Sequence, residues 1–249
     1  MTPLKTDLSI WKKLELNAPP VGVKFLLEET PKEPIQKLDE TKYTLCEMIK
    51  VAQKSPDKFY INADNESCVG SFILGMNELP PAALSGQMGK AMGIFQDERC
   101  NARLYHDLPR MKSGTVGSVV FSPLDQIDFD PDLLFVLAEP SVGEIILRAM
   151  TYSTGERYHS CFQPVMACAF LFAYPLLSGK VNFITTGMSY GMKTFEVFRP
   201  GQILMAIPYQ WIPTITRNLG EIDWVLEPYK MGRDRYAEYF AKIVEQTEG

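Results

Sequence analysis

Histidine is scarce in this sequence: His106 and His159 are the two that occur in 249 residues. A metal site built from several imidazoles is therefore excluded, and any metal would have to bind to sulfur or carboxylate ligands. The same scarcity limits hydrolase chemistry, because a Ser-His-Asp triad would have to use one of these two side chains as its base. His159 lies near Cys161, so a Cys-His pair is compatible with the sequence, although a solvated loop histidine is the simpler interpretation.

Long apolar segments and clustered basic residues are also lacking. The most apolar stretch, residues 164–177, is shorter than the roughly 20 residues that cross a bilayer and contains Pro164 and Pro175. Charges interrupt residues 1–16, which have no apolar run of signal-peptide length. The net charge is -5 and the Lys and Arg residues are dispersed, so no basic stripe is available to neutralise a nucleic-acid backbone. We therefore expect a cytoplasmic protein that binds neither nucleic acid nor membrane.

Five cysteines are present, and none of them forms a C-x-x-C pair with another. Their odd number and wide spacing argue against a disulfide framework and favour reduced thiols. Cys100 lies in a charged stretch, whereas the other four lie at the edges of short apolar segments beside glycine and methionine. Sulfur chemistry is therefore expected at these four: Cys46, Cys68, Cys161 and Cys168.

Apolar periodicity predicts helices and strands in alternation. Helical spacing is found over residues 8–16, 43–54, 141–150, 163–177 and 234–245. Strand-like runs are found over residues 21–27, 58–62, 115–122, 133–138, 181–185 and 193–198. Residues 202–207 fit either type, and a brief helix after Cys68 is expected to have Ser67 as its N-cap.

This alternation favours an α/β or α+β fold, in which a mixed sheet is flanked by helices. A hydrophobic content of 46% over this length is sufficient for a sizeable core. One globular domain over residues 1–249 and two sub-domains at 1–112 and 113–249 are both compatible with the pattern.

A short internal repeat relates two of the cysteines. The interval from Cys46 to Lys58 equals that from Cys168 to Lys180. Each lysine is followed by an apolar strand and then by a Gly-Met pair. The pattern indicates two similar strand-helix-strand halves, although a single equal spacing also arises by chance.

Several short motifs together resemble a known family. They are Leu14-Glu15-Leu16 ahead of Pro19-Pro20-Val21-Gly22-Val23-Lys24-Phe25, Cys46 on its helix, Cys68-Val69-Gly70-Ser71 with Leu74-Gly75, Ser122-Pro123-Leu124, Asp130-Pro131-Asp132, and Cys168 with Pro175 and Gly179-Lys180. Over roughly residues 5–215 the chain is similar to the domain-of-unknown-function 169 family, whose members occur largely in anaerobic archaea and bacteria. The family usually has Cys-Pro-Gly-Gly near Cys68, where this chain has Val69 and Ser71 in place of the proline and the second glycine. The resemblance implies a fold and a cysteine-centred site, but no reaction.

The leading hypothesis is an iron-sulfur cluster or another metal bound by cysteine thiolates, the form of cysteine that ligates such groups. We expect Cys46, Cys68 and Cys168 to converge on one pocket, with Cys161 or His159 as a fourth ligand. At the start of its predicted helix, the Cys68 thiolate would be favoured by the helix dipole. Such a centre would serve redox or ligand-activation chemistry in an anaerobic organism. The alternative is that these cysteines are small buried hydrophobic residues.

Two other classes of function fit the sequence. A cofactor-free pocket could bind a small organic or anionic ligand through Lys24, Lys180 and the turn from Gly187 to Gly191. If a cofactor is bound instead, these residues and Gly70 are the candidates to contact it. A subunit without chemistry of its own would instead present exposed aromatic residues, namely Trp11, Tyr209 and Trp211. A homo-oligomer is compatible with each hypothesis, and no catalytic residue is assigned.

Overall fold

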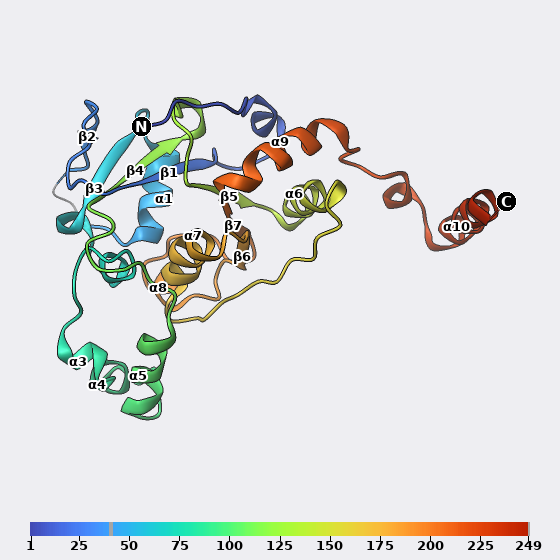
Figure 1. Cartoon of the computed structure of the whole chain (residues 1–249). Helices are drawn as coiled ribbons and strands as arrows, with labels where there is room; N and C mark the ends of the chain where they lie inside the picture. The colour runs from blue at the N-terminus through green and yellow to red at the C-terminus, as the bar shows by residue number, and fades with distance from the viewer. Residues whose placement is uncertain (40–41, 249) are drawn as a thin grey trace.

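A seven-stranded mixed sheet forms the centre of the computed structural model, which describes residues 1–39 and 42–248 (Figure 1). Its strand order is β2-β3-β4-β1-β5-β7-β6. Neighbouring strands are antiparallel, apart from the parallel pair β2 and β3. The strands are β1 (Val21–Leu26), β2 (Gln36–Lys37), β3 (Phe59–Asn62), β4 (Ser118–Pro123), β5 (Leu133–Ala138), β6 (Asn182–Thr185) and β7 (Ile203–Pro208). The predicted fold class, a mixed sheet with flanking helices, is confirmed.

Helices cover both faces of this sheet. The α-helices are α1 (Leu45–Lys54), α2 (Gly70–Ile73), α3 (Pro81–Leu84), α4 (Gln87–Ala91), α5 (Glu98–Asp107), α6 (Pro140–Tyr152), α7 (Tyr174–Ser178), α8 (Tyr190–Thr194), α9 (Ile212–Glu221) and α10 (Arg233–Glu248). The π-helix η4 (Ala169–Ala173) runs directly into α7, and the 3-10 helices are η1 (Ser9–Lys13), η2 (Ala63–Asn65), η3 (Leu124–Gln126), η5 (Tyr209–Trp211) and η6 (Glu227–Lys230). In the described part of the chain, no helix has both the length and the apolar character needed to cross a bilayer.

The two halves of the sheet repeat one order of connections. β1 leads through α1 to β3 and β4, and it pairs with β4, which pairs with β3. β5 leads through η4 and α7 to β6 and β7, and it pairs with β7, which pairs with β6. β1 and β5 pair antiparallel at the centre, so an approximate twofold axis passes between them. This is the repeated order expected from the equal spacing of Cys46 and Cys168. Because β1 lies between β4 and β5, residues 1–112 and 113–249 share one sheet.

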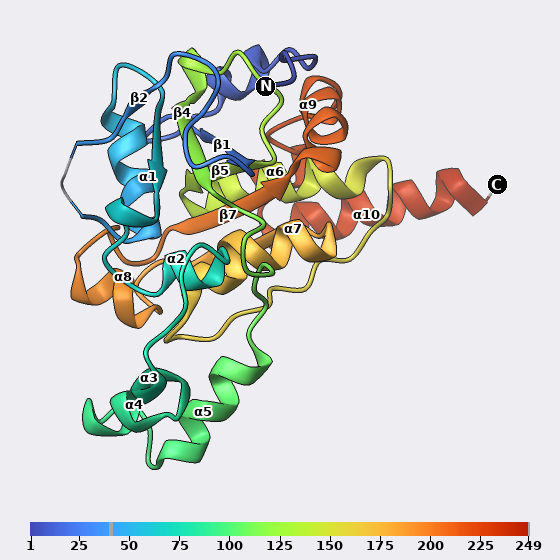
Figure 2. The ribbon, with the colours of Figure 1, turned by 60° about the vertical axis from the view of Figure 1, so that its left-hand side comes forward.

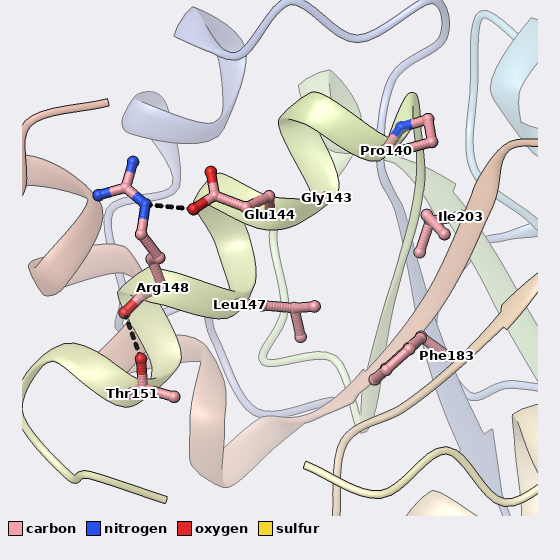
Figure 3. Close-up of a pocket in the computed structure, with 8 residues that line it drawn as sticks. All are labelled: Pro140, Gly143, Glu144, Leu147, Arg148, Thr151, Phe183 and Ile203. Atoms are coloured by element: carbon pink, nitrogen blue, oxygen red, sulfur yellow. Dashed lines mark hydrogen bonds and ion pairs between the residues drawn. The ribbon is translucent and has the colours of Figure 1, made fainter. Parts of the chain in front are cut away.

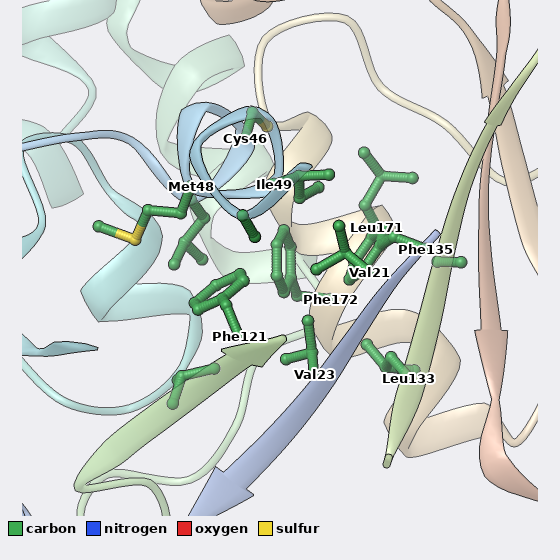
Figure 4. Packing of buried hydrophobic residues seen from close by; sticks show 14 of the residues in the cluster. Val21, Val23, Cys46, Met48, Ile49, Phe121, Leu133, Phe135, Leu171 and Phe172 are labelled. Carbon is green, nitrogen blue, oxygen red and sulfur yellow. The ribbon is translucent and has the colours of Figure 1, made fainter. Parts of the chain in front are cut away.

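Alternating residues of the central strands enter two separate cores. In β5, Leu133 and Phe135 face α1 and η4, whereas Leu134 and Val136 face α6 and α9. A strand that is buried on both faces reads as a continuous apolar run, as this one does. Figure 4 shows the first core, where Phe172 of η4 packs against Phe135 with ring centroids 4.7 Å apart. The core therefore holds α1 and η4 firmly on the same face of the sheet.

Some predicted elements are wrong. Residues 193–198 do not form a strand, because the Ser189 side chain accepts the Met192 N–H and starts α8 instead. Residues 202–207, which fitted either type, fall within strand β7 except for Gln202. The opening helix is reduced to η1, and α2 begins at Gly70 without a side-chain cap, so Ser67 is not its N-cap. α9 was not predicted, although Ile212, Ile215 and Leu219 have helical spacing and are buried.

Two parts of the chain stand away from the sheet. Helices α3, α4 and α5 form a lobe to one side (Figure 2), and α10 extends outward past α9 and α6 (Figure 1). The predicted helix near the C-terminus is present, but its apolar side chains Tyr236, Phe240 and Ile243 are exposed. α10 is therefore amphipathic without packing on the core.

We expect removal of residues 232–249 to change the Tm by no more than about 2 °C, because no described side chain of α10 is buried. Removal of residues 212–249 is the matched control, since it also deletes the buried Ile215 and Leu219 and should lower the Tm by more than about 10 °C. Circular dichroism during heating measures both. An equal decrease in Tm in the two truncated proteins would show that α10 does pack on the core.

Candidate functional site

Three of the cysteines singled out above line one cavity of about 40 Å³, here called the cysteine cavity. They are Cys46, Cys68 and Cys168. Other wall residues are Thr44, Glu66, Gly70, Ala167, Ser189 and Met192. In the described conformation no three His, Cys, Asp or Glu side chains are grouped closely enough to hold a metal ion. The thiols therefore share a cavity without forming a finished coordination shell.

Cys46 and Cys168 each lie in the first turn of a helix. α1 begins after Thr44, whose Oγ1 accepts the Glu47 N–H while the Glu47 carboxylate accepts the Thr44 N–H. Residues 167–178 form the equivalent helical run of the second half, with Cys168 as its second residue. Both helix N-termini, with their partial positive charge, are thus directed toward the cysteine cavity.

The segment that carries Glu66 and Cys68 is fixed beside the start of α1 by a short backbone bridge. The Tyr43 N–H donates to the Asn65 carbonyl at 3.0 Å, and the Ser67 N–H donates to the Tyr43 carbonyl at 3.1 Å. This bridge brings a residue 23 positions away in the sequence against the helix N-terminus. The cavity therefore depends on long-range pairing rather than on a local motif.

Gly70 permits a close approach at this point. A Cβ atom there would lie 2.5 Å from Leu45 Cγ and 2.8 Å from Glu66 Oε1. Leu45 is buried in the core, so it has little room to move. Gly70, predicted to bind a cofactor through its backbone, is placed at the cavity wall by this steric requirement.

Burial keeps the three thiols protonated. It raises the pKa of Cys46, and the neighbouring Cys68 and Glu66 raise it further. Burial likewise raises the pKa of Cys168, with additional effects of Cys46 and Cys68. Cys68 is more exposed, at the cavity mouth, yet partial burial and then Glu66 raise its pKa too. The expected stabilisation of a Cys68 thiolate by a helix dipole is therefore wrong, because desolvation dominates and α2 starts two residues later.

Glu66 is a buried carboxyl group that lies near several N–H groups without forming a hydrogen bond of normal geometry among the described residues. The residue is 8% exposed. Burial raises its pKa, and the nearby backbone N–H groups of Ser71, Cys68 and Gly70, with the Ser71 side chain, offset this only in part. Sequence reasoning missed Glu66, and the one available signal was an acidic residue two positions before a cysteine. Buried ionisable groups in a cavity are common at functional sites.

The other predicted ligands lie elsewhere. Cys161 is half-buried, its N–H donates to Asn182 Oδ1, and it is not one of the residues described as lining the cysteine cavity. His159 lines a different cleft, and Cys100 is exposed on α5. The role of Cys161 or His159 as a fourth ligand thus stays a prediction, and it would require the loop that carries both residues to move toward the cysteine cavity.

The residues that were predicted to form one anion-binding pocket lie in different parts of the structure. Gly191 lines the cysteine cavity, and Lys180 lines the cleft that contains His159. Gly187, at φ 88°, packs against Pro200. The Lys24 Nζ is 2.6 Å from an oxygen of Asp132. The structure does not combine them into one pocket.

Residues 187–191 also fit the G-x-S-x-G pattern of serine hydrolases, which sequence reasoning missed. Ser189 follows β6 and precedes α8, as a nucleophile would, but its φ of -94° and ψ of 133° are ordinary extended values. Its side chain caps α8, and neither histidine is described as lining this cavity. The arrangement supports a capping role for Ser189.

The proposed aromatic interface is not formed. Trp11 is completely buried, and its Nε1 donates to Thr216 Oγ1 at 2.8 Å. Tyr209 and Trp211 are half-buried against the same core. An interface made of Trp11, Tyr209 and Trp211 is therefore wrong, because the first of them is a core residue.

A larger apolar groove of about 310 Å³ lies beside α6 (Figure 3). Leu147, Phe183 and Ile203 form its apolar wall. The charged residues at its edge form an ion pair, in which Arg148 Nε donates to the Glu144 carboxylate at 2.6 Å. The groove lacks the unpaired polar groups that distinguish the cysteine cavity, so it is the weaker candidate for chemistry.

Comparison with known proteins agrees with the motif-level resemblance. The model of the domain-of-unknown-function 169 family, described as "Uncharacterised ArCR", matches residues 9–218. An uncharacterized protein of Methanocaldococcus jannaschii, MJ0308, is 28% identical over 208 residues, which cover 82% of this chain and 88% of that protein. No solved structure matches.

Proposed function

Because the chain belongs to the domain-of-unknown-function 169 family, whose description assigns no activity, we propose a function from the geometry of the cysteine cavity. The cavity binds one thiophilic metal ion through Cys46, Cys68 and Cys168. The observation that carries this proposal is the placement of three thiols from separate elements around one cavity that is also lined by the buried Glu66 carboxyl.

The volume of the cavity favours an ion over an organic molecule. Sites for small organic ligands usually enclose about 300–1,000 Å³. The cysteine cavity, at about 40 Å³, has room for a metal ion or one or two water molecules. A multi-iron cluster would need the walls to separate, so a single ion is the form that the present walls accommodate.

The donor set suits a soft or borderline metal ion. Sulfur ligands select zinc, copper(I) and iron, and three thiolates leave one position of a four-coordinate ion open. Cys46 and Cys168 lie on helices held by the core, so their side chains would have to rotate toward a shared ion. Metal binding would displace the thiol protons.

Access at the cavity mouth determines what such a centre would do. Cys68 is exposed, so a small ligand could reach an ion bound next to it. An open coordination position is characteristic of catalytic metal sites, whereas structural sites are closed by four protein ligands. The role we propose is therefore redox or ligand-activation chemistry.

Anaerobic purification followed by analysis of zinc, copper, iron and sulfide tests the proposal. We expect about one metal ion per chain and no stoichiometric sulfide, whereas equal iron and sulfide would indicate a cluster instead. Co²⁺ titration of the chelator-treated protein should give intense thiolate-to-metal absorption. Cys46→Ala, Cys68→Ala and Cys168→Ala should each weaken Co²⁺ binding by roughly 100-fold or more, a loss beyond that of a supporting residue.

Cys100→Ser and Cys161→Ser are the matched controls, because both remove a thiol outside the cysteine cavity. We expect both variants to retain the Co²⁺ spectrum. Loss of the Co²⁺ spectrum in Cys161→Ser would show that Cys161 is the fourth ligand, as predicted from the sequence. A metal-free protein that shows no thiolate absorption with Co²⁺ would refute the proposal.

A further inference from the structure

A third cavity, of about 430 Å³, lies between the loop that follows α6 and the entrance to β6. Its volume is within the range of small-molecule sites, unlike that of the cysteine cavity. It is called the basic cleft here, and its wall residues are Glu156, Arg157, Tyr158, His159, Lys180, Val181 and Trp211. None of them lines the cysteine cavity, so the two are separate sites.

The basic cleft collects two cationic side chains and one histidine that lack partners. Within the described residues, the side chains of Arg157, His159 and Lys180 make no hydrogen bond or ion pair, and all three are exposed. Elsewhere in the chain, Arg199 pairs with the carboxylate of Glu139. The one acidic wall residue is Glu156. In a chain of net charge -5, such a convergence of unpaired cations favours an anion as the occupant.

Aromatic rings supply a second kind of surface. Trp211 is half-buried, and its Nε1 donates to the Gly179 carbonyl at 3.0 Å, which fixes the orientation of the indole. The Tyr158 ring meets the indole edge to face, with centroids 6.3 Å apart. A planar group in the cleft can therefore stack on an aromatic wall while its charged end reaches the cations.

Hydrogen bonds hold both sides of the cleft in place. On the Lys180 side, Gln210 Nε2 also donates to the Gly179 carbonyl, at 2.8 Å, and Gly179 has the left-handed φ of 66° that favours glycine. On the loop side, the Cys161 N–H donates to Asn182 Oδ1 at 2.9 Å. Lys180 thus follows a residue whose carbonyl is held by two side chains, and such preorganisation lowers the entropic cost of binding.

We propose that the basic cleft binds a small planar organic anion that carries a phosphate or carboxylate group. Arg157 offers a forked pair of donors for two anion oxygens, Lys180 offers a point charge, and Trp211 offers a stacking surface. The inference is independent of metal binding in the cysteine cavity.

Titration with AMP, benzoate, inorganic phosphate and adenosine, followed by tryptophan fluorescence and thermal shift, tests this assignment. We expect saturable binding of AMP or benzoate, and weaker binding of phosphate and of uncharged adenosine. Arg157→Ala and Lys180→Ala should each weaken the binding roughly tenfold, because each removes one charge-assisted contact. Lys242→Ala, which removes an exposed lysine of α10, should leave it unchanged.

Four results would overturn the proposal. One is the absence of saturable binding for all four probes. Another is undiminished AMP binding in the Arg157→Ala/Lys180→Ala double variant with a normal Tm. The third is adenosine binding as tight as that of AMP, which would show that charge is not recognised. The fourth is phosphate binding as tight as that of AMP, which would show that the cleft does not recognise a planar group. Cys46→Ala should not affect any of these measurements.

Discussion

Asn182→Ala is expected to lower the Tm by about 10 °C or more, the largest loss from any single polar residue described here. Asn182 is completely buried at the start of β6. Its amide donates to the carbonyls of Cys161 at 2.8 Å and Phe170 at 2.7 Å and accepts the Cys161 N–H at 2.9 Å. Alanine would leave three backbone groups without this partner, at about 1–3 kcal/mol for each that stays buried. Thermal and urea denaturation measure the effect.

Two further variants test whether the loss of stability comes from the buried hydrogen bonds of Asn182. Asn17→Ala also removes one amide hydrogen bond, to Glu139, but at an exposed position, so we expect little change. Asn182→Asp keeps the shape but places carboxylate oxygens against two carbonyls, so it should destabilise at least as much as alanine. A stable Asn182→Asp protein would show that the network is not required.

Asn182 also connects the two candidate sites. Its bonds to Cys161 fix the loop of the basic cleft, while its bond to Phe170 supports the helical run that begins beside Cys168. We therefore expect Asn182 variants that still fold to bind the anion more weakly than wild type, even under conditions where the buried core stays intact. This coupling follows from one fully buried side chain that bonds to two elements.

The parts of the fold that were predictable are those set by local pattern. The unbroken apolar run of β5 predicts a strand buried on both faces, and the structure has it at the expected bounds. The equal spacing that starts at Cys46 and Cys168 reflects the duplicated order of strands and helices. Local periodicity specifies these elements because each side chain is placed by the helix or strand period alone.

Features that depend on distant contacts were not predictable. Glu66 reads as a solvated acidic residue until the bridge to Tyr43 places it beside α1. Trp11 reads as an interface residue until α9, which was not predicted, is seen to cover it and accept its Nε1 hydrogen bond at Thr216. In both cases burial results from the packing of segments far apart in the sequence, and no local pattern records it.

The duplicated fold explains why the cysteine cavity lies where it does. The helices that carry Cys46 and Cys168 are equivalent in the two halves, and so are the segments that follow β3 and β6. The first of these segments supplies Glu66 and Cys68, and the second supplies Ser189. The walls are thus related by the approximate twofold axis, whereas the ionisable groups beyond the paired cysteines come from the first half. Such asymmetry directs the carboxyl and the exposed thiol to one side of the cavity.

Glu66→Gln is expected to stabilise the metal-free protein near neutral pH, by about 1–3 kcal/mol, or roughly 2–10 °C in Tm. Burial raises the pKa of Glu66, so the folded protein binds this proton more tightly than the unfolded chain does. The favourable contribution of that proton is complete below the unfolded pKa and is lost as the pH rises through the folded pKa. The gain from glutamine should therefore be present at about pH 8 and absent near pH 4.

Denaturation of chelator-treated wild type, Glu66→Gln and Glu15→Gln at both pH values measures this difference. Glu15 is exposed, so its variant should match wild type at each pH. If Glu66 also donates an oxygen to a bound ion, the stabilised Glu66→Gln protein should bind Co²⁺ more weakly than wild type. A variant that gains stability while it loses metal affinity is the result expected where a costly buried group is retained for function. Loss of stability at pH 8 would show that burial does not destabilise the charged form of Glu66 in the folded protein.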